Sequence, residues 1–545
     1  LNFFDSVEYR IPLPLFYSCQ RPFGIALYQH WVQEVGDDYG WPSAEFFDQP
    51  RTWVEATLLD TDCAARNIQV CRAVGDACLP APEATLYRIP ADGGRERLAL
   101  DDDGFVGTPS VVQNGDRLWA TWPAVEEAHS TLLHTSATIP VDQGAFEPDG
   151  TLRVEIGPER PLLLQDLAVS AQWLVEGDPV YRDLLADRIR LGSDYFYDFT
   201  AGQFMLGDVT VYQMGEQWEA SDVRLYLSNV NRPNSAVGGI VDDFTPDISP
   251  SVAISYAPGA LAMGKEWNRY MAPPGQSVNV GGAPVNPLTL VDDWSIALAL
   301  ELGHYLLFLF DTYVDAEGGE SQALGERCYG SAMGQVYDPL NHSFVWDPTH
   351  WEADCGATQA YVQTGGRTEW ETIQGWYPWT VSPMGPQPVT PSAPMTPAVS
   401  LTTITFVSPS DPPSQPLAAS QLFDLLYVDD ETASYEARAF TFREDRIFDQ
   451  GKPPAGLNQV ELTDARIDDR LCVFDLNDHG QGAATPRYQF GCETIQAGDA
   501  ALNLTKNEAW RPLVEAKQLD TTRMAISVTQ EFVDPAAAIR LRIYP

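Results

Sequence analysis

The first part of the chain alternates between apolar and polar positions over short stretches, a pattern typical of β-strands. The segment TLYRIPADGGRERLAL (85–100) predicts a strand, a glycine-containing turn and a second strand. The stretches DRLWATWPAV (116–125) and STLLHTSATIPV (130–141) are further strand candidates, because both are rich in aromatic and branched residues. We therefore predict a mostly β, sandwich-like domain over residues 1–160.

The pattern changes over residues 161–380. DPVYRDLLADRIRLGSDYFYDFT (178–200) has apolar residues at helical spacing, whereas 207–214 and 221–230 alternate as strands do. An apolar helix is predicted around 293–310. Helices mixed with strands in one segment indicate an α/β or α+β domain.

Seven prolines between Pro378 and Pro397 mark a domain boundary. Such a run favours an extended, stiff linker, which we place at residues 381–416. Residues 417–545 again predict β-strands and turns, as one or two small sandwich-like domains. The predicted fold class is thus multidomain α+β, with a central α/β domain between two β domains.

Charge excludes some partners. The chain has 33 Lys and Arg against 76 Asp and Glu, a formal net charge of −43. A surface this acidic repels phosphate groups, which argues against nucleic acid as a partner. The apolar stretch Trp294 to Phe310 is shorter than the roughly 20 residues of a membrane span and contains Glu301 and His304, so we predict a buried helix and no membrane span.

The chain has eight cysteines and no C-x-x-C motif, which disfavours zinc ribbons and thioredoxin-type redox sites. Because the cysteines fall into local groups, we expect two disulfides, Cys328–Cys355 and Cys472–Cys492. The pairing of Cys19, Cys63, Cys71 and Cys78 stays open. Disulfides would place the chain in an oxidising compartment, secreted or at the cell surface, with any signal peptide already removed before Leu1. The alternative is a set of buried free thiols.

The segment Leu300 to Asp311, LELGHYLLFLFD, suggests a zinc site that has lost a ligand. Zinc peptidases use H-E-x-x-H on a helix, where two imidazoles four residues apart bind one metal and the glutamate acts as general base. Here Glu301, His304 and Asp311 stand in the places of the base, the second ligand and a third ligand. Leu300 stands in the first-ligand place and cannot bind a metal. The alternative is a satisfied His–Glu pair in a leucine-rich core.

Further motifs over residues 160–380 strengthen this interpretation, and the region resembles the bacterial relatives of the calcium-activated chloride channel regulator family, whose N-terminal part is a metzincin-like zinc peptidase. The resemblance rests on these segments in order: YDFTAGQFMLGDVTVY (197–212), DVRLYLSNVNRPNSAVGG (222–239), YAPGALAMGKEWNRY (256–270), ALELGHYLLFLFDTY (299–313), CYGSAM (328–333) and GRTEWETI (366–373).

The resemblance implies a metzincin-like central domain with Glu301 as general base, His304 and Asp311 as zinc ligands and Met333 in the methionine turn below the metal. Two positions depart from the family pattern. Leu300 replaces the first histidine, and Phe308 replaces a glycine at which the chain turns toward the third ligand. A bulky residue there could displace Asp311. Both changes affect the site while the surrounding motifs persist, which is the pattern of a pseudoenzyme.

Weaker candidates lie elsewhere. A replacement zinc ligand could come from His342, His350 or the two residues Asp292 and Asp293 at the start of the helix. Asp475, Asn477 and Asp478 have spacing reminiscent of a calcium loop, as does LDDDGF (100–105) to a lesser degree, although solvated turns would explain both. Asn341-His-Ser343 and Asn503-Leu-Thr505 match the spacing of glycosylation sites.

Three functions compete. The first is an exported, non-catalytic metallopeptidase-like protein that serves as a structural or adhesion component and binds no cofactor. The second is an active zinc endopeptidase with an altered ligand set, since Glu301 is retained. The third is a subunit of an extracellular filament or sheath, assembled through the apolar segment 1–17 by strand addition. In each case the expected partners are proteins or further copies of the chain.

Overall fold

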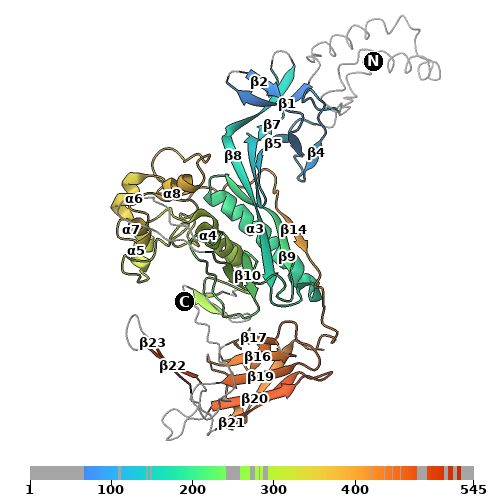
Figure 1. Ribbon diagram of the computed structural model, residues 1–545, viewed down its shortest axis with the longest axis vertical. Coiled ribbons are helices and arrows are strands. Elements are labelled where there is room, and N and C mark those ends of the chain that lie inside the picture. The colour runs from blue at the N-terminus through green and yellow to red at the C-terminus, as the bar shows by residue number, and fades with distance from the viewer. Residues whose placement is uncertain are drawn as a thin grey trace, which may run out of the picture. The chain divides into compact units, whose positions relative to one another are not determined.

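The computed structural model describes most of the chain from Asn67 to Val528 (Figure 1). The described residues are 67–75, 77–107, 112–142, 145–147, 150–240, 258–270, 277–280, 283–285, 292–418, 420–434, 436–444, 446–454, 456–475, 488–507, 514–518 and 524–528. The segment 1–17, Cys19, Cys63, Asn477 and Asp478 lie outside these residues.

Contacts divide the chain into two compact units. The first comprises Leu1–Leu225, Arg232–Met263 and Leu290–Ser410, and the second comprises Tyr226–Asn231, Gly264–Thr289 and Asp411–Pro545. The mixture of helices and β-sheets confirms a multidomain α+β chain.

The strands predicted in the first part of the chain are present. They are β1 (Asn67–Val74), β2 (Ala77–Pro80), β3 (Thr85–Ile89), β4 (Glu96–Leu98), β5 (Arg117–Glu126), β6 (Ser130–Ser136) and β7 (Ile139–Pro140). A buried cluster that includes Ile68, Leu86, Leu118 and Val154 forms their core. Within the described residues, these strands and those of the central region belong to one twelve-stranded sheet.

Strand β8 (Thr151–Ala171) connects the two regions and runs through the boundary expected at residue 160 (Figure 1). Its first half pairs in parallel with β1, from Asn67↔Thr151 to Arg72↔Ile156. Its second half pairs in parallel with β9 (Phe204–Tyr212). One strand therefore contributes to the cores of both the N-terminal and the central regions.

The central region begins with a β-α-β unit. Strand β8 leads into α3 (Pro179–Phe199), which Asp178 caps by accepting hydrogen bonds from the backbone of Val180 and Tyr181, and the chain returns in β9. The sheet continues through β10 (Val223–Tyr226) to β11 (Leu261–Gly264).

Helix α4 (Asp292–Leu307) packs against α3 and the sheet. A Cβ on Gly192 of α3 would lie 2.8 Å from Leu298 of α4, so glycine allows the two helices to approach closely. Apolar side chains of the sheet and both helices converge here, among them Leu167, Ile189, Val223, Trp294 and Leu298. This packing fixes the position of the candidate site on α4.

The remaining helices of the first unit follow α4. They are α5 (Gln322–Arg327), α6 (Pro348–Asp354), α7 (Gln359–Gln363) and α8 (Glu369–Trp376), with a short 3-10 turn η5 (Val175–Gly177) earlier in the chain. Within the expected linker 381–416, β14 (Thr403–Phe406) pairs in parallel with β9, from Thr403↔Asp208 to Phe406↔Val211. Part of this proline-rich stretch therefore completes the sheet of the first unit.

The second unit is built mainly of strands, as predicted for residues 417–545. A sheet in the order β17-β16-β19-β20-β21-β15-β18 comprises β15 (Leu422–Tyr427), β16 (Arg438–Arg443), β17 (Arg446–Gly451), β18 (Gln459–Glu461), β19 (Arg470–Asp475), β20 (Tyr488–Thr494) and β21 (Ala501–Asn507). The smaller elements are β12 (Val278–Val280), β13 (Ala283–Val285), β22 (Val514–Gln518), β23 (Met524–Val528) and the 3-10 turn η7 (Val428–Asp430). Phe423, Leu425, Leu471 and Leu502 are among the residues of its core.

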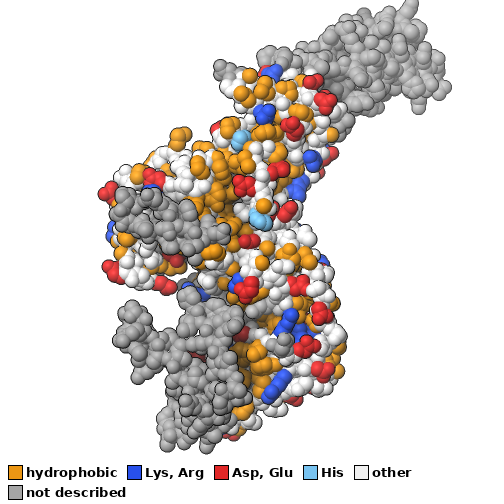
Figure 2. All heavy atoms as spheres, in the orientation of Figure 1, with side chains coloured by type: hydrophobic (Ala, Val, Ile, Leu, Met, Phe, Trp, Pro, Cys, Tyr) orange, Lys and Arg blue, Asp and Glu red, His pale blue; other side chains and the backbone are white. Residues whose placement is uncertain are grey.

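Both predicted disulfides are present. Cys328 is bonded to Cys355 and Cys472 to Cys492, and a third bond joins Cys71 to Cys78. Three disulfides fit an oxidising compartment. No helix among the described residues is both long and apolar enough to span a membrane. Acidic side chains are scattered over the visible face and do not gather in one patch (Figure 2).

Candidate functional site

Helix α4 carries the site motif. It is nearly all apolar between Trp294 and Leu307, and Glu301 and His304 are only 6% exposed. Leu300 is half-buried and precedes His304 by one helical turn, so the two side chains lie on the same face. The expectation of a buried helix is confirmed.

The chain leaves α4 at Phe308, just after the last helical residue, Leu307. Phe308 has φ 63°, the left-handed conformation that favours glycine. Its buried ring stacks on Trp376 of α8, with centroids 3.7 Å apart and planes 7° from parallel. This stacking compensates for the backbone strain, and the turn is retained.

Asp311 lies next to His304. The distance from His304 Nε2 to Asp311 Oδ1 is 3.2 Å, and His304 Nδ1 lies 2.7 Å from the carbonyl oxygen of Leu309. Burial lowers the pKa of His304, but the charge and hydrogen bond of Asp311, together with Glu301 and the Leu309 carbonyl, outweigh it and raise that pKa to about 9. The carboxylate of Asp311 therefore favours the protonated form of the imidazole.

Glu301 is buried beside this pair. Burial is the main cause that raises the pKa of Glu301 to about 7, with Asp311 adding to the effect and His304 opposing it. The phenol of Tyr313 borders the same group, and burial followed by the charge of Asp311 raises its pKa. A carboxyl group that titrates near neutral pH is suited to general base chemistry.

The residues present do not fit a catalytic zinc ion. Such an ion takes three protein ligands and a water, whereas this site offers His304 and Asp311. Among the described residues, the one group of three His, Cys, Asp or Glu side chains close enough to share an ion is Cys71, Cys78 and Glu155. Its two sulfurs are bonded to each other and are not free to bind. His304 and Asp311 contact each other directly, with Nε2 and Oδ1 3.2 Å apart.

Met333 lies next to α4, in the turn over residues 328–333, which we call the methionine turn. It is fully buried, and a Cβ on Gly303 would lie 2.6 Å from Met333 Sδ. Gly303 is therefore the residue that allows α4 to rest on the methionine. Thr312 N–H donates a hydrogen bond to the Met333 carbonyl oxygen at 2.9 Å, which connects the segment after α4 to the same turn.

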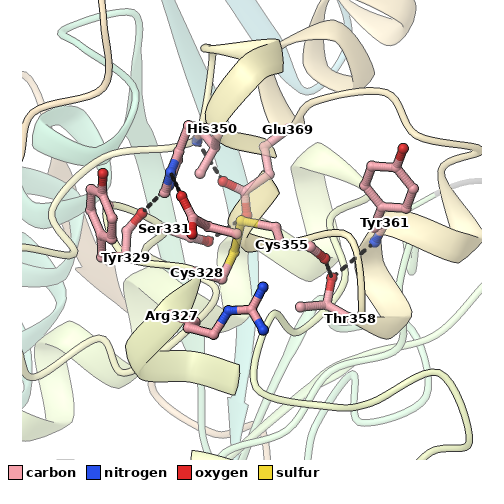
Figure 3. Close-up of a disulfide and its surroundings, with 12 residues drawn as sticks. Arg327, Cys328, Tyr329, Ser331, His350, Cys355, Thr358, Tyr361 and Glu369 are labelled. Atoms are coloured by element: carbon pink, nitrogen blue, oxygen red, sulfur yellow. Dashed lines mark hydrogen bonds and ion pairs between the residues drawn. A yellow bond between two sulfur atoms is a disulfide. The ribbon is translucent and has the colours of Figure 1, made fainter. Parts of the chain in front are cut away.

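Glu369 holds the methionine turn from behind, a role that sequence reasoning missed. Its carboxyl group accepts hydrogen bonds from Ser331 Oγ at 2.5 Å and from Val345 N–H at 2.6 Å, and Ser331 Oγ accepts one from Met333 N–H at 3.1 Å (Figure 3). Burial raises the pKa of Glu369 to about 7. The sequence signal for this role was a glutamate at the start of a helix, directly before Trp370. A glutamate at that position is more commonly an exposed residue whose charge interacts with the helix N-terminus.

The other histidines of the region do not join the site. Both ring nitrogens of His350 are engaged, Nδ1 with Asp354 at 2.9 Å and Nε2 with the Tyr329 carbonyl at 2.8 Å, beside the Cys328–Cys355 disulfide (Figure 3). His342 Nδ1 lies 3.3 Å from Asp198 of α3. Asp292 and Asp293 lie at the start of α4, about three turns before His304. The structure brings together Glu301, His304 and Asp311 and no replacement ligand from these residues.

The calcium candidates among the described residues are structural. Asp475 is fully buried and accepts hydrogen bonds from the Tyr427 hydroxyl and the Ser434 backbone, both at 3.0 Å. Asp101 Oδ1 accepts from the backbone N–H groups of Asp103 and Phe105, which closes the 100–105 turn. These hydrogen bonds stabilise the local backbone around both aspartates.

The two glycosylation motifs differ in exposure. Asn341 is 3% exposed, and its amide accepts from Gly330 N–H and donates to the Gln335 carbonyl. Asn503 is exposed on β21. Asn341 is therefore a structural residue of the methionine turn.

Comparison with known proteins gives no relative. No protein-family model matches the chain. No curated protein and no solved structure is significantly similar to it.

Proposed function

We propose that the chain is an exported, non-catalytic protein with a metzincin-like central domain, acting as a structural or adhesion component outside the cell. The observation that carries the proposal is the His304–Asp311 ion pair at 3.2 Å, with Leu300 in the place of the missing ligand. The contact between Gly303 of the buried helix α4 and Met333 supports the proposed fold of the central domain. The three disulfides support export.

Zinc binding tests the proposal. Purified chain should carry far less than one zinc ion per molecule, and Leu300→His should raise zinc affinity on the order of 100-fold or more, because it supplies the third ligand. The matched control adds Asp311→Asn to Leu300→His, which should abolish the gain. One zinc ion per unmodified chain, lost on His304→Ala, would overturn the proposal.

A second candidate function is an active zinc endopeptidase with an altered ligand set. It is favoured by the retention of Glu301 with a pKa raised to about 7 by burial. Cleavage of an unfolded protein substrate by the unmodified chain, with loss of activity in Glu301→Gln, would establish it. Equal rates for the two forms would remove it.

A further inference from the structure

The strap that leads from α8 to β14, residues 377–402, carries no charged side chain. No Asp, Glu, Lys, Arg or His occurs between Glu371 and Asp411, although charged residues make up 20% of the chain. Every residue over 388–396 is nevertheless exposed, and Val389 is 69% exposed. Charged residues ordinarily lie at the surface, so an exposed run without them offers an uncharged contact surface.

The strap is bound to the first unit on both sides of its exposed part. On one side the buried Gln387 side chain donates to the Gly330 carbonyl at 3.2 Å. On the other side Met395 N–H donates to Asp198 of α3 at 2.5 Å. Within the part of the chain that the structure describes, residues 388–394 between these two anchors make no hydrogen bond. The exposed part is therefore held at its ends and leaves its own groups free for another molecule.

Prolines in this part recur at every third residue, as Pro391, Pro394 and Pro397. Proline fixes φ near about −65° and restricts the residue before it to extended conformations, so the sequence P-S-A-P-M-T-P favours a polyproline II helix. The described backbone over 391–397 has no turn or bend, as such a helix requires. Because polyproline II has three residues per turn, the three prolines lie along one edge.

The proline edge is not the edge that contacts the first unit. Met395 lies one-third of a turn from Pro394, and its sulfur is 3.0 Å from the position of a Cβ on Gly202, just after α3. Pro391 and Pro394 are exposed, and Pro397 is half-buried. The position that packs on the protein and the prolines that face solvent are therefore on different edges of the helix.

We propose that residues 391–397 are a recognition segment, whose proline edge docks into an aromatic-lined groove of a partner protein domain. Proline rings pack on aromatic rings without a charged contact, which matches the uncharged stretch between Glu371 and Asp411. Because both ends of the exposed part are held, little conformational entropy is lost on binding. The inference goes beyond the function proposed above and holds whether or not the site on α4 binds zinc.

The test uses the full chain and three isotope-labelled probes, an SH3, a WW and an EVH1 domain, whose grooves bind polyproline II segments. NMR signals of the groove residues should shift when the chain is added, with a dissociation constant of about 1 mM or tighter for at least one domain. Pro391→Ala together with Pro394→Ala should weaken that binding about tenfold or more, because the apolar rings that enter the groove are removed.

Two controls separate the proline edge from the proline content. Pro386→Ala together with Pro388→Ala removes the same number of exposed prolines before the bend at 389–390 and should change binding less than about twofold. One serine inserted after Ser392 keeps every proline but moves Pro394 off the edge of Pro391, and it should weaken binding as much as the double alanine variant does. Thermal unfolding should be the same for all forms, because the changed residues are exposed.

Two results would overturn the proposal. One is the absence of binding to all three domains, and the other is equal binding of the unmodified chain and the form with the inserted serine. In either case the segment is a spacer between α8 and β14 only. The zinc measurements on Leu300→His do not depend on this outcome, so the two proposals fail separately.

Discussion

Two single residues determine the packing and the end of α4. Gly303 allows the helix to contact Met333, and Phe308 forms the turn at which the helix ends. Gly303 meets Met333 so closely that any side chain would displace one of them. Phe308 takes a backbone conformation natural to glycine and is held there by the Trp376 ring. Gly303 and Phe308 each make a contact that depends on the size of the residue, so a change of size at either position disturbs the packing of α4.

Gly303→Ala should destabilise the first unit by about 1–3 kcal/mol, because the new Cβ would lie 2.6 Å from Met333 Sδ. Gly375→Ala in α8 is the matched control, since nothing lies within 4 Å of its Cβ position. That control should be neutral or stabilise by up to about 1 kcal/mol through helix propensity. Urea unfolding monitored by tryptophan fluorescence gives both values. A stabilising effect of Gly303→Ala would contradict the close contact with Met333.

At the scale of elements, α8 is the support of the site helix. It begins with a capping box, in which Thr368 and Glu371 each accept a hydrogen bond from the other's backbone N–H, at 3.1 and 2.8 Å. Its first residue, Glu369, holds the methionine turn, and Trp376 at its other end stacks on Phe308. One short helix therefore fixes both the loop below α4 and the turn that ends α4.

Glu369 should make stability depend on pH. Burial raises the pKa of Glu369 to about 7 in the folded chain from an ordinary value of 4.5, so folding favours the protonated form. Its contribution is fully present below about pH 4.5 and is lost as pH rises through about 7. Glu369→Gln, which keeps a donor and an acceptor, should therefore flatten the pH profile between about pH 5 and 8, by up to about 3 kcal/mol.

Denaturant unfolding across this pH range, compared between the two forms, checks the prediction. Glu301 and Asp194 have pKa values raised by burial to about 7 and about 6, and they add slopes of the same sign in both forms. Only the difference between the forms reports Glu369. Glu371→Gln, at an exposed position of the same helix, is the control, and an equal flattening there would count against the role of Glu369.

At the scale of the whole molecule, the two units are stabilised differently. The first is organised by an apolar sheet and helices, whereas the second contains a buried ion cluster. Arg443 on β16 donates to both carboxyl oxygens of Asp469 at 2.8 Å, and Asp464 accepts from Arg443 and from Arg466. All four side chains are at most 8% exposed, and their two positive and two negative charges balance.

Arg443→Met should destabilise the second unit by about 3–5 kcal/mol, because it leaves Asp464 and Asp469 buried with too little positive charge. Arg438→Met on the same strand is the matched control. Arg438 pairs with Asp449 at 3.4 Å, with side chains 35% and 40% exposed, so its loss should cost less than about 1 kcal/mol. Hydrogen exchange of β16 and β19 reports the change. Equal effects of the two substitutions would contradict a buried network.

Much of the organisation could be predicted from local patterns. The helices at 178–200 and 293–310 and the strands at 85–100, 116–125 and 130–141 follow from apolar periodicity. The disulfides Cys328–Cys355 and Cys472–Cys492 follow from local grouping of cysteines. In contrast, the course of β8 through residue 160 could not be predicted, because an apolar run does not reveal which of its halves pairs with which strands.

The candidate site divides in the same way. The presence of Leu300 one turn before His304 is plain from the sequence, and the position of Glu301 and His304 on one buried helix followed from their spacing. The position of Asp311 could not be predicted from the sequence. It depends on the backbone turn at Phe308, which the Trp376 ring of α8 stabilises. The role of Glu369 likewise depends on two acceptor contacts with loops more than twenty residues away in sequence.

The sequence by itself determined the main periodic helices and strands, the net charge, two of the disulfides and the presence of Leu300 one turn before His304, because each of these depends on residue identity or on neighbours within a few turns. Only the tertiary structure decided what His304 contacts, what supports α4 and what pairs with the outer edge of β11. Those features arise from contacts between segments far apart in the chain, such as Gly238 with His304 and Asn234 with Ala262. Their geometry exists only once burial has brought the segments together.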